Sequence, residues 1–157
     1  LGAIWYRTGD SVVMVMIAVL LLSGVIRLVS FMNFHRALKA GLTPEDYKVW
    51  EWRYSICGSV FLGLIGIFDF LIFARQSDGL VHLFAISMTM AYVIGISGRN
   101  FASASIVQTQ VLVVSVPMVL GLILFGDGYH ALLGMMLIPF FVALIFSGVY
   151  DLINLTS

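Results

Sequence analysis

The chain alternates between long apolar stretches and short polar segments. Five stretches of roughly 17–20 residues contain few polar side chains, and they cover residues 12–29, 56–74, 80–96, 106–125 and 129–146. At about 1.5 Å of rise per helical residue, each is long enough to cross a hydrocarbon core about 30 Å thick. The pattern therefore predicts an all-α fold, a polytopic bundle of transmembrane helices with spans at about residues 12–32, 54–74, 80–97, 104–125 and 129–147.

Composition agrees with a membrane protein. Hydrophobic residues make up 61% of the 157 residues, charged residues make up 10%, and the mean hydropathy is +1.08. A soluble domain carries about 25% charged residues, so the whole chain is interpreted as one transmembrane domain. The net charge is zero, which provides no basic surface for nucleic acid. The single Cys57 excludes an internal disulfide and a cysteine-based metal cluster.

The first residues indicate a further helix upstream. Residues 1–6 end in Trp5 and Tyr6, which are aromatic residues typical of the membrane interface. The segment has no initial Met and no charged start of a signal peptide. We interpret residues 1–6 as the last turns of an upstream helix, so the intact domain is expected to have six helices.

The charges of the loops predict an orientation. When successive loops are placed on alternate sides of the membrane, one side receives Arg36, Lys39, Lys48, Arg53 and Arg99. The other side receives only Arg7 and Arg75. Because basic residues are enriched in cytoplasmic loops, the first side is expected to face the cytoplasm, together with the C-terminus.

Residues 33–53 are expected to form a cytoplasmic loop and a juxtamembrane helix. The motif Thr43-Pro-Glu-Asp46 is typical of a helix start, with Thr43 as the N-cap and acidic residues in the first turn. This helix should continue through Tyr54 into the membrane. The segment serves either as an aromatic anchor or as a docking site for a cytoplasmic partner domain. Ser11 is the expected cap of the first complete span.

Two ionisable residues lie inside the predicted spans. Arg27 is about two turns from the cytoplasmic end of its span, from which a long side chain can reach the lipid headgroups. Asp69 lies more than a turn below the outer surface, and its short carboxylate cannot reach the interface. An intramembrane carboxylate indicates either an ion pair or a ligand or proton site, with Arg75, Arg7 and His82 as candidate partners.

Two histidines begin spans at the predicted outer face. His82 and His130 stand beside Asp78 and Asp127, respectively. If the helices converge, these four residues could bind a divalent metal, and the two histidines could hold a haem. Their spacing is not that of a local ligand motif, and helix capping also explains the two acids. No bound cofactor is therefore expected.

The third predicted span has polar positions on one side and a polar junction at its end. Its polar stripe is suited to hydrogen bonds between helices and consists of Ser87, Thr89, Tyr92 and Ser97. At the junction, Gly98 permits a tight C-cap. Arg99 and Asn100 follow it and are candidates for coupling the bundle to an output domain.

Several motifs spread over most of the chain carry a family resemblance. They are Tyr6-Arg-Thr-Gly-Asp10, Trp50-Glu-Trp-Arg-Tyr54, His82-Leu-Phe-Ala-Ile-Ser-Met-Thr89, Tyr92-Val-Ile-Gly-Ile-Ser-Gly-Arg-Asn-Phe101, Val107-Gln-Thr-Gln110, and Leu133-Gly followed by Pro139-Phe-Phe. Together they resemble the N-terminal membrane sensor region, of the MASE kind, in bacterial cyclic-di-GMP proteins with GGDEF and EAL domains.

The resemblance implies a sensory and anchoring domain in the bacterial inner membrane. A membrane or periplasmic stimulus would shift the bundle, and the last helix would relay that shift to a cytoplasmic output domain. The output domain would be a diguanylate cyclase, a cyclic-di-GMP phosphodiesterase or both. The resemblance also implies a homodimer formed through the membrane and output domains. The chain contains no GGDEF, EAL or other catalytic motif, so no catalytic residue is expected within it.

Two other functions stay open. The apolar composition also fits a small structural subunit of a larger photosynthetic or respiratory membrane complex. The intramembrane Asp69 favours a fragment of a transporter or channel.

Overall fold

The chain folds into a set of long helices. The computed structural model describes residue 6 and residues 9–41, 43–99 and 104–156. These residues form α2 (Ser11–Ala40), α3 (Pro44–Arg75), α4 (Gly79–Arg99), α5 (Ala104–Phe125) and α6 (Gly128–Thr156). Each helix contains a segment long and apolar enough to cross a membrane, so the predicted all-α bundle with five spans is confirmed. The predicted upstream helix falls on residues 1–6, which lie outside the described residues except for Tyr6.

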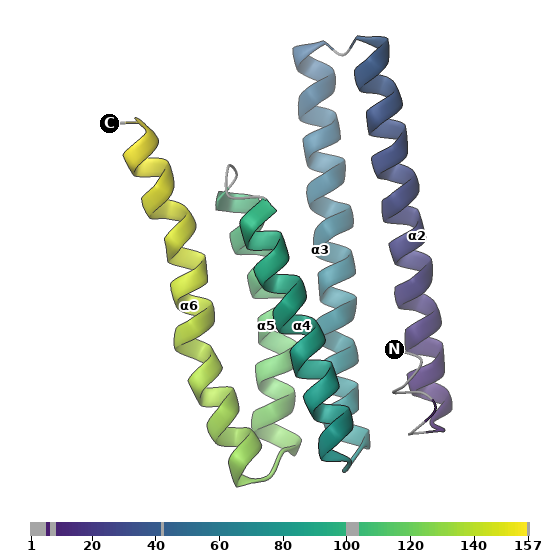
Figure 1. Cartoon of the computed structure of the whole chain (residues 1–157), viewed down its shortest axis with the longest axis vertical. Helices are drawn as coiled ribbons and strands as arrows, with labels where there is room; N and C mark the ends of the chain where they lie inside the picture. Colours follow the sequence, from purple (N-terminus) through teal and green to yellow (C-terminus); the bar gives the residue numbers. More distant parts are fainter. Residues whose placement is uncertain (1–5, 7–8, 42, 100–103, 157) are drawn as a thin grey trace.

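Successive helices run in opposite directions, so their connections gather at the two ends of the bundle (Figure 1). The connections after α3 and α5 lie at one end, and the last turns of α2 and α4 point toward the other. Within the bundle, α5 packs against both α3 and α6, while α3 also contacts α2 and α4. The pair α3 and α5 therefore forms the centre of the fold.

The two longest helices, α2 and α3, extend beyond α4 and α5 at one end (Figure 1). Residues 33–53 were predicted as a cytoplasmic loop and a juxtamembrane helix. The helix begins at Pro44 as expected, whereas the preceding loop is shorter than predicted because α2 stays helical to Ala40. Contact between the rings of Phe34 and Trp50, at 5.7 Å between centroids, holds the two helix ends together. The turn itself is short because Gly41 takes a positive φ of 89° that other residues rarely adopt.

Capping fixes the starts of α2 and α3. The Thr43 hydroxyl accepts from the amide of Asp46 at 3.3 Å, and the Asp46 carboxylate accepts from the amide of Thr43 at 3.1 Å. This reciprocal pair confirms Thr43 as the N-cap, and α3 runs unbroken past Tyr54 as predicted. The cap of α2 is Asp10, whose carboxylate accepts from the amide of Val12 at 2.8 Å. The expectation of Ser11 as cap is wrong by one residue, since Ser11 already belongs to the helix.

The core lies between α3 and α5. Buried apolar residues recur at helical spacing on α3 and face a matching set on α5, namely Leu62, Ile65, Phe68 and Ile72 against Val111, Val114, Met118 and Leu122. A β-carbon added at Gly66 would lie 2.7 Å from the carbonyl oxygen of Val114. The missing side chain therefore allows the two backbones to approach closely, which is how helices gain packing energy in a membrane.

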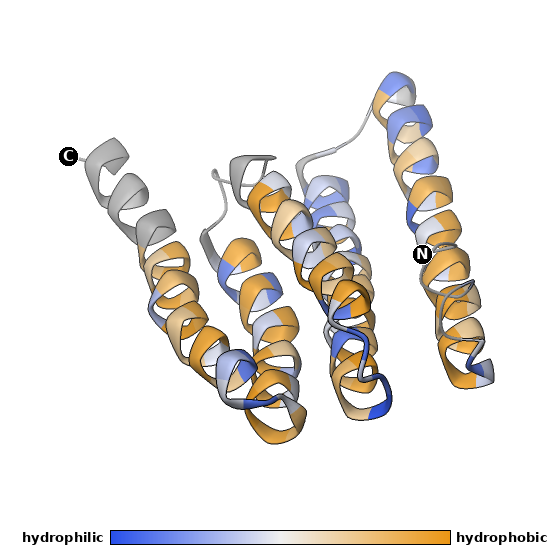
Figure 2. Ribbon diagram, turned by 60° about the horizontal axis from the view of Figure 1, so that its bottom comes forward, coloured by the Kyte–Doolittle hydropathy of each residue, from blue (hydrophilic) through white to orange (hydrophobic). Residues whose placement is uncertain are grey.

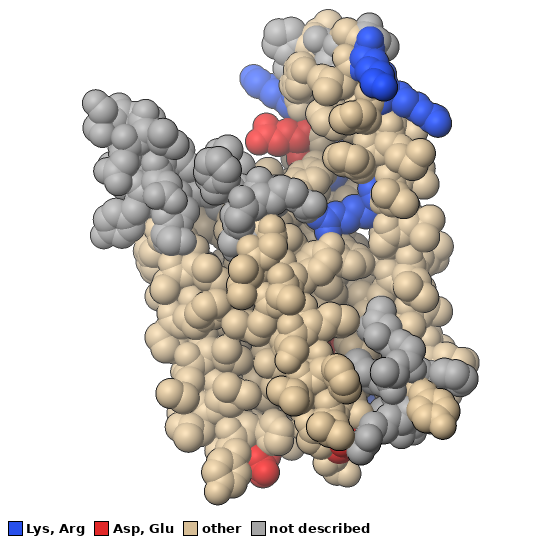
Figure 3. Space-filling model, viewed as in Figure 1, with Lys and Arg blue, Asp and Glu red and all other residues tan. Residues whose placement is uncertain are grey.

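The outside of the bundle is apolar, and its charges lie mainly toward the ends. Figure 2 shows apolar positions along the exposed middle of the helices, and on α2 these include Leu21, Leu22, Val25 and Leu28. Basic side chains gather where α2 meets α3 (Figure 3), the end that carries Lys39. Such a surface suits a lipid environment, in which helices satisfy their own backbone hydrogen bonds.

Candidate functional site

A cluster of His82, His130 and Asp127, termed here the histidine cluster, joins helix ends at one end of the bundle. Nδ1 of His82 lies 3.0 Å from Nε2 of His130. On the far side of each ring, Nε2 of His82 lies 2.8 Å from the carbonyl oxygen of Gln76, and Nδ1 of His130 lies 2.6 Å from Asp127. One hydrogen-bonded chain thus joins the loop after α3 to the starts of α4 and α6.

Helix capping orients the two rings. Asp78 accepts from the amide two residues later, and its carbonyl accepts from the amide of His82, which places His82 in the first turn of α4. Asp127 accepts from the amide of His130 at 3.0 Å and places that residue in the first turn of α6. Gly126 is required beside them, because an added β-carbon there would collide with Cβ of His130.

The hydrogen-bond chain ends on an acceptor at each side. The carbonyl of Gln76 only accepts, so Nε2 of His82 donates to it. Hydrogen bonds from the amide and ring of His130 lower the pKa of Asp127, so its carboxylate also accepts. The contact between Nδ1 of His82 and Nε2 of His130 joins these two halves of the chain.

A cavity of about 480 Å³ adjoins the histidine cluster, between the loops after α3 and α5. Both histidines and Asp127 line it, together with Phe73, whose ring meets the His82 ring edge-on at 5.2 Å between centroids. Arg75 also lines the cavity and is held by Asp10, with 2.9 Å between Nε and the carboxylate. The cavity can bring water or a small polar solute to the histidines.

The arrangement does not suit a metal or haem. Ligands of one metal point their donor atoms at a common position. Here Nε2 of His130 faces His82, whereas Asp127 contacts the opposite nitrogen of the same ring. The direct contact between the two rings leaves no space for a porphyrin, and Asp78 caps α4. Among the described residues, no three His, Cys, Asp or Glu side chains could share a metal ion.

Asp69 lies fully buried in α3 and is hydrogen-bonded to α4. Its carboxylate accepts from the hydroxyl of Thr89 at 2.6 Å, and its other oxygen, Oδ1, has no hydrogen-bond partner among the described residues. The expected partners are otherwise engaged, since Arg75 pairs with Asp10 and His82 bonds His130, while Arg7 lies outside the described residues. Thr89 lies seven residues after His82, about 10 Å deeper along α4.

Arg27 of α2 also finds its partner on α4. Its Nη1 donates to the hydroxyl of Tyr92 at 2.6 Å, so the guanidinium is held inside the bundle. Thr89 and Tyr92 both belong to the predicted polar stripe, and both make the interhelical hydrogen bonds expected of it. The sequence identified these donors, whereas their pairing with Asp69 and Arg27 depends on how the helices pack.

The polar junction predicted at the end of α4 is described only in part. Gly98 lies inside α4, which continues through Arg99, so the expected C-cap at Gly98 is wrong. The side chain of Arg99 and all of Asn100 lie outside the described residues, and their coupling role stays a prediction.

Sequence reasoning did not single out Gln110 as a site, although it is fully buried against Gly58. An amide within an apolar span was the available signal.

No family model, curated protein or solved structure matches the chain.

Proposed function

We propose that this chain is the membrane-embedded sensory domain of a bacterial cyclic-di-GMP signalling protein. A membrane or periplasmic stimulus acts at the histidine cluster, and α6 relays the change to a cytoplasmic GGDEF or EAL output domain outside this chain. The cyclase or phosphodiesterase activity belongs to that output domain. The family resemblance and the geometry of α6 support the proposal.

The observation that carries the proposal is the hydrogen bond between His82 and His130. It ties the first turn of α6 to α4. From there α6 continues without interruption to Thr156, ten residues past the end of its apolar span at Phe146. This continuous helix, about 44 Å long and with Pro139 inside it, connects the two ends of the bundle and provides a route for a displacement between them. A stimulus that breaks this hydrogen bond frees the start of α6 from α4 and thus moves the far end of α6.

Orientation and assembly complete the proposal. The end where α2 meets α3 carries the basic residues and faces the cytoplasm, as does the far end of α6. The protein resides in the bacterial inner membrane. It acts as a homodimer, through this domain and the output domain, because the resemblance implies a dimeric catalytic part.

The full gene provides the first test. We expect the reading frame to continue beyond Ser157 into a nucleotide-cyclase or phosphodiesterase domain. A stop codon directly after Ser157 would contradict the proposal. So would stoichiometric co-purification with other membrane subunits, which is the result expected of a structural subunit.

A second candidate, part of a proton transporter, is favoured by the buried Asp69. One carboxylate oxygen lacks a partner among the described residues, which is the kind of group that proton pathways use. Proton uptake into proteoliposomes distinguishes this candidate. Uptake by the full-length protein that is abolished in Asp69→Asn supports transport, whereas equal background leak in both proteins refutes it.

A further inference from the structure

A second cavity, distinct from the histidine cluster, lies between α2 and α3 toward their joined ends. It measures about 700 Å³, and Tyr92 of α4 lines its inner side. Its lining is mostly apolar and aromatic and includes Phe34 and Trp50. Leu28 and Phe31 also line it and are more than half exposed, so the cavity reaches the lipid-facing surface. An acyl chain can therefore enter it sideways from a bilayer.

Arg27 provides a positive charge inside this cavity. One of its nitrogens donates to Tyr92, and the guanidinium carbon lies 5.9 Å from the ring centre of Tyr54 and 5.6 Å from that of Phe61. Its Nη2 is buried and has no hydrogen-bond partner among the described residues. Guanidinium groups bind phosphate through two parallel N–H donors. The unpartnered Nη2 is therefore available to donate to an anionic group such as a phosphate.

Glu51 provides a negative charge in the same cavity. It lines the cavity on α3 and is exposed, and none of the ion pairs between described residues joins it to Arg27. The cavity thus offers separate sites for a cation and an anion. A ligand with both charges fits it better than a simple anion, which Glu51 would repel.

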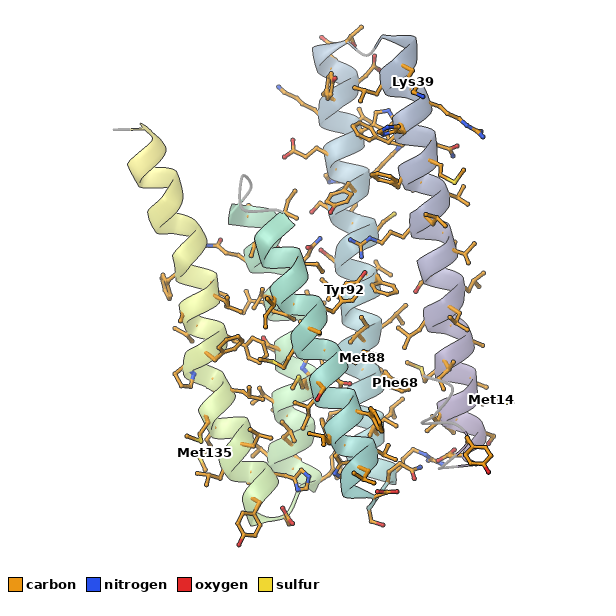
Figure 4. All side chains as sticks on the ribbon, viewed as in Figure 1. Met14, Lys39, Phe68, Met88, Tyr92 and Met135 are labelled. Atoms are coloured by element: carbon orange, nitrogen blue, oxygen red, sulfur yellow. The ribbon has the colours of Figure 1, made fainter. Side chains whose placement is uncertain are left out.

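Arg27 and Glu51 lie at different depths in the membrane. The pair of Asp10 and Arg75 aligns the outer ends of α2 and α3. From that end, Arg27 lies about 24 Å along α2 and Glu51 about 36 Å along α3. With a hydrocarbon core of about 30 Å, Arg27 lies just inside the lipid phase and Glu51 among the headgroups. Figure 3 shows basic atoms in the groove beside α2, and Figure 4 shows Tyr92 on the side of α4 nearest α2.

We propose that this cavity binds one phosphatidylethanolamine molecule of the cytoplasmic leaflet. Arg27 holds the phosphate, which lies nearer the hydrocarbon, and Glu51 holds the ammonium group, which lies nearer the water. One acyl chain runs along Leu28 and Phe31. The proposal rests on the geometry of α2, α3 and Tyr92, takes its leaflet from the orientation proposed above, and is independent of the signalling function.

Native mass spectrometry of the full-length protein tests the site. The protein is delipidated in detergent and titrated separately with dioleoyl-phosphatidylethanolamine and dioleoyl-phosphatidylglycerol. We expect one phosphatidylethanolamine bound at least tenfold more tightly than phosphatidylglycerol. Arg27→Gln should weaken this binding by about tenfold or more, because it removes charge-assisted hydrogen bonds to the phosphate.

Two exposed positions give variants that should not affect folding. Glu51→Gln should shift the preference toward phosphatidylglycerol, since the ammonium loses its partner. Arg53 is a neighbouring basic residue that does not line the cavity, although its guanidinium lies over the ring of Trp50, which does. Arg53→Gln should therefore bind both lipids as the unmodified protein does. Equal affinity of the unmodified protein for both lipids, tighter binding of phosphatidylglycerol, or an unchanged preference in Glu51→Gln would overturn the proposal.

Discussion

Replacing Gly66 by alanine should push α3 and α5 apart. The new methyl group would lie 2.7 Å from the carbonyl oxygen and 3.1 Å from Cα of Val114, and 3.2 Å from Cγ of Pro117. Ordinary contact begins near 3.4 Å, so the methyl group overlaps by about 0.7 Å with backbone atoms that cannot rotate away. The two central helices must therefore separate.

The expected loss follows from two opposing terms. Overpacking of a buried contact costs about 1–3 kcal/mol. The alanine recovers about 0.5–1 kcal/mol from its higher helix propensity. Subtracting the midpoints leaves a net loss of about 1.25 kcal/mol, within a range of about 0–2.5 kcal/mol. This loss corresponds to an apparent Tm lower by about 3–5 °C for a chain of this size.

Thermal unfolding in detergent, followed by tryptophan fluorescence, measures this shift. The matched control is Gly95→Ala on α4, where an added β-carbon has no neighbour within 4 Å. The control should keep or slightly raise the Tm, because it gains helix propensity without an overlap. Equal Tm values for Gly66→Ala and Gly95→Ala would contradict the close contact between α3 and α5.

Two further predictions concern polar contacts between helices. Thr89→Val keeps the shape of the side chain but removes the donor to the buried Asp69, so it should lower the free energy of unfolding by about 1–3 kcal/mol. Thr89→Ser keeps the donor and should lower it by less. Equal Tm values for the two variants would count against the hydrogen bond. Hydrogen bonds from Arg75 and from the start of α2 lower the pKa of Asp10 below its ordinary 3.8. The stabilisation of the folded state by the ionised Asp10 carboxylate is therefore complete above pH 3.8 and is lost as the pH falls through the lowered pKa. The Tm difference between the unmodified protein and Asp10→Asn should thus shrink below about pH 4, and a difference that stays constant down to pH 2 would refute the assignment.

The sequence was sufficient for features that depend on local pattern. The five apolar stretches predicted the five spans, because a bilayer imposes a minimum apolar length on each helix. The start of α3 at Thr43 was also predictable, since capping involves residues only three apart. The helical extension of α2 to Ala40 was not, because polar and charged residues interrupt the apolar pattern over residues 33–40 and the contact between Phe34 and Trp50 supports the helix there.

The candidate site was only partly predictable. His82 and His130 could be recognised as polar residues near the same end of the bundle, but they lie 48 positions apart in the sequence. Their contact depends on the order in which α4 and α6 pack around α5, which hydropathy does not encode. In the same way, Asp69 was recognisable as an unusual residue, whereas its partner Thr89 emerged only from the register of α3 against α4.

Cyclic-di-GMP turnover by the full-length protein in membrane vesicles tests the proposed function most directly. His130→Gln removes the imidazole ring that joins His82 to Asp127, and the matched control is Tyr129→Gln at the neighbouring position, which is 84% exposed. If the histidine cluster governs the output through α6, turnover in His130→Gln should change several-fold while Tyr129→Gln matches the unmodified protein. Equal turnover in all three proteins, at equal amounts in the membrane, or no turnover in any of them, would contradict the sensory function.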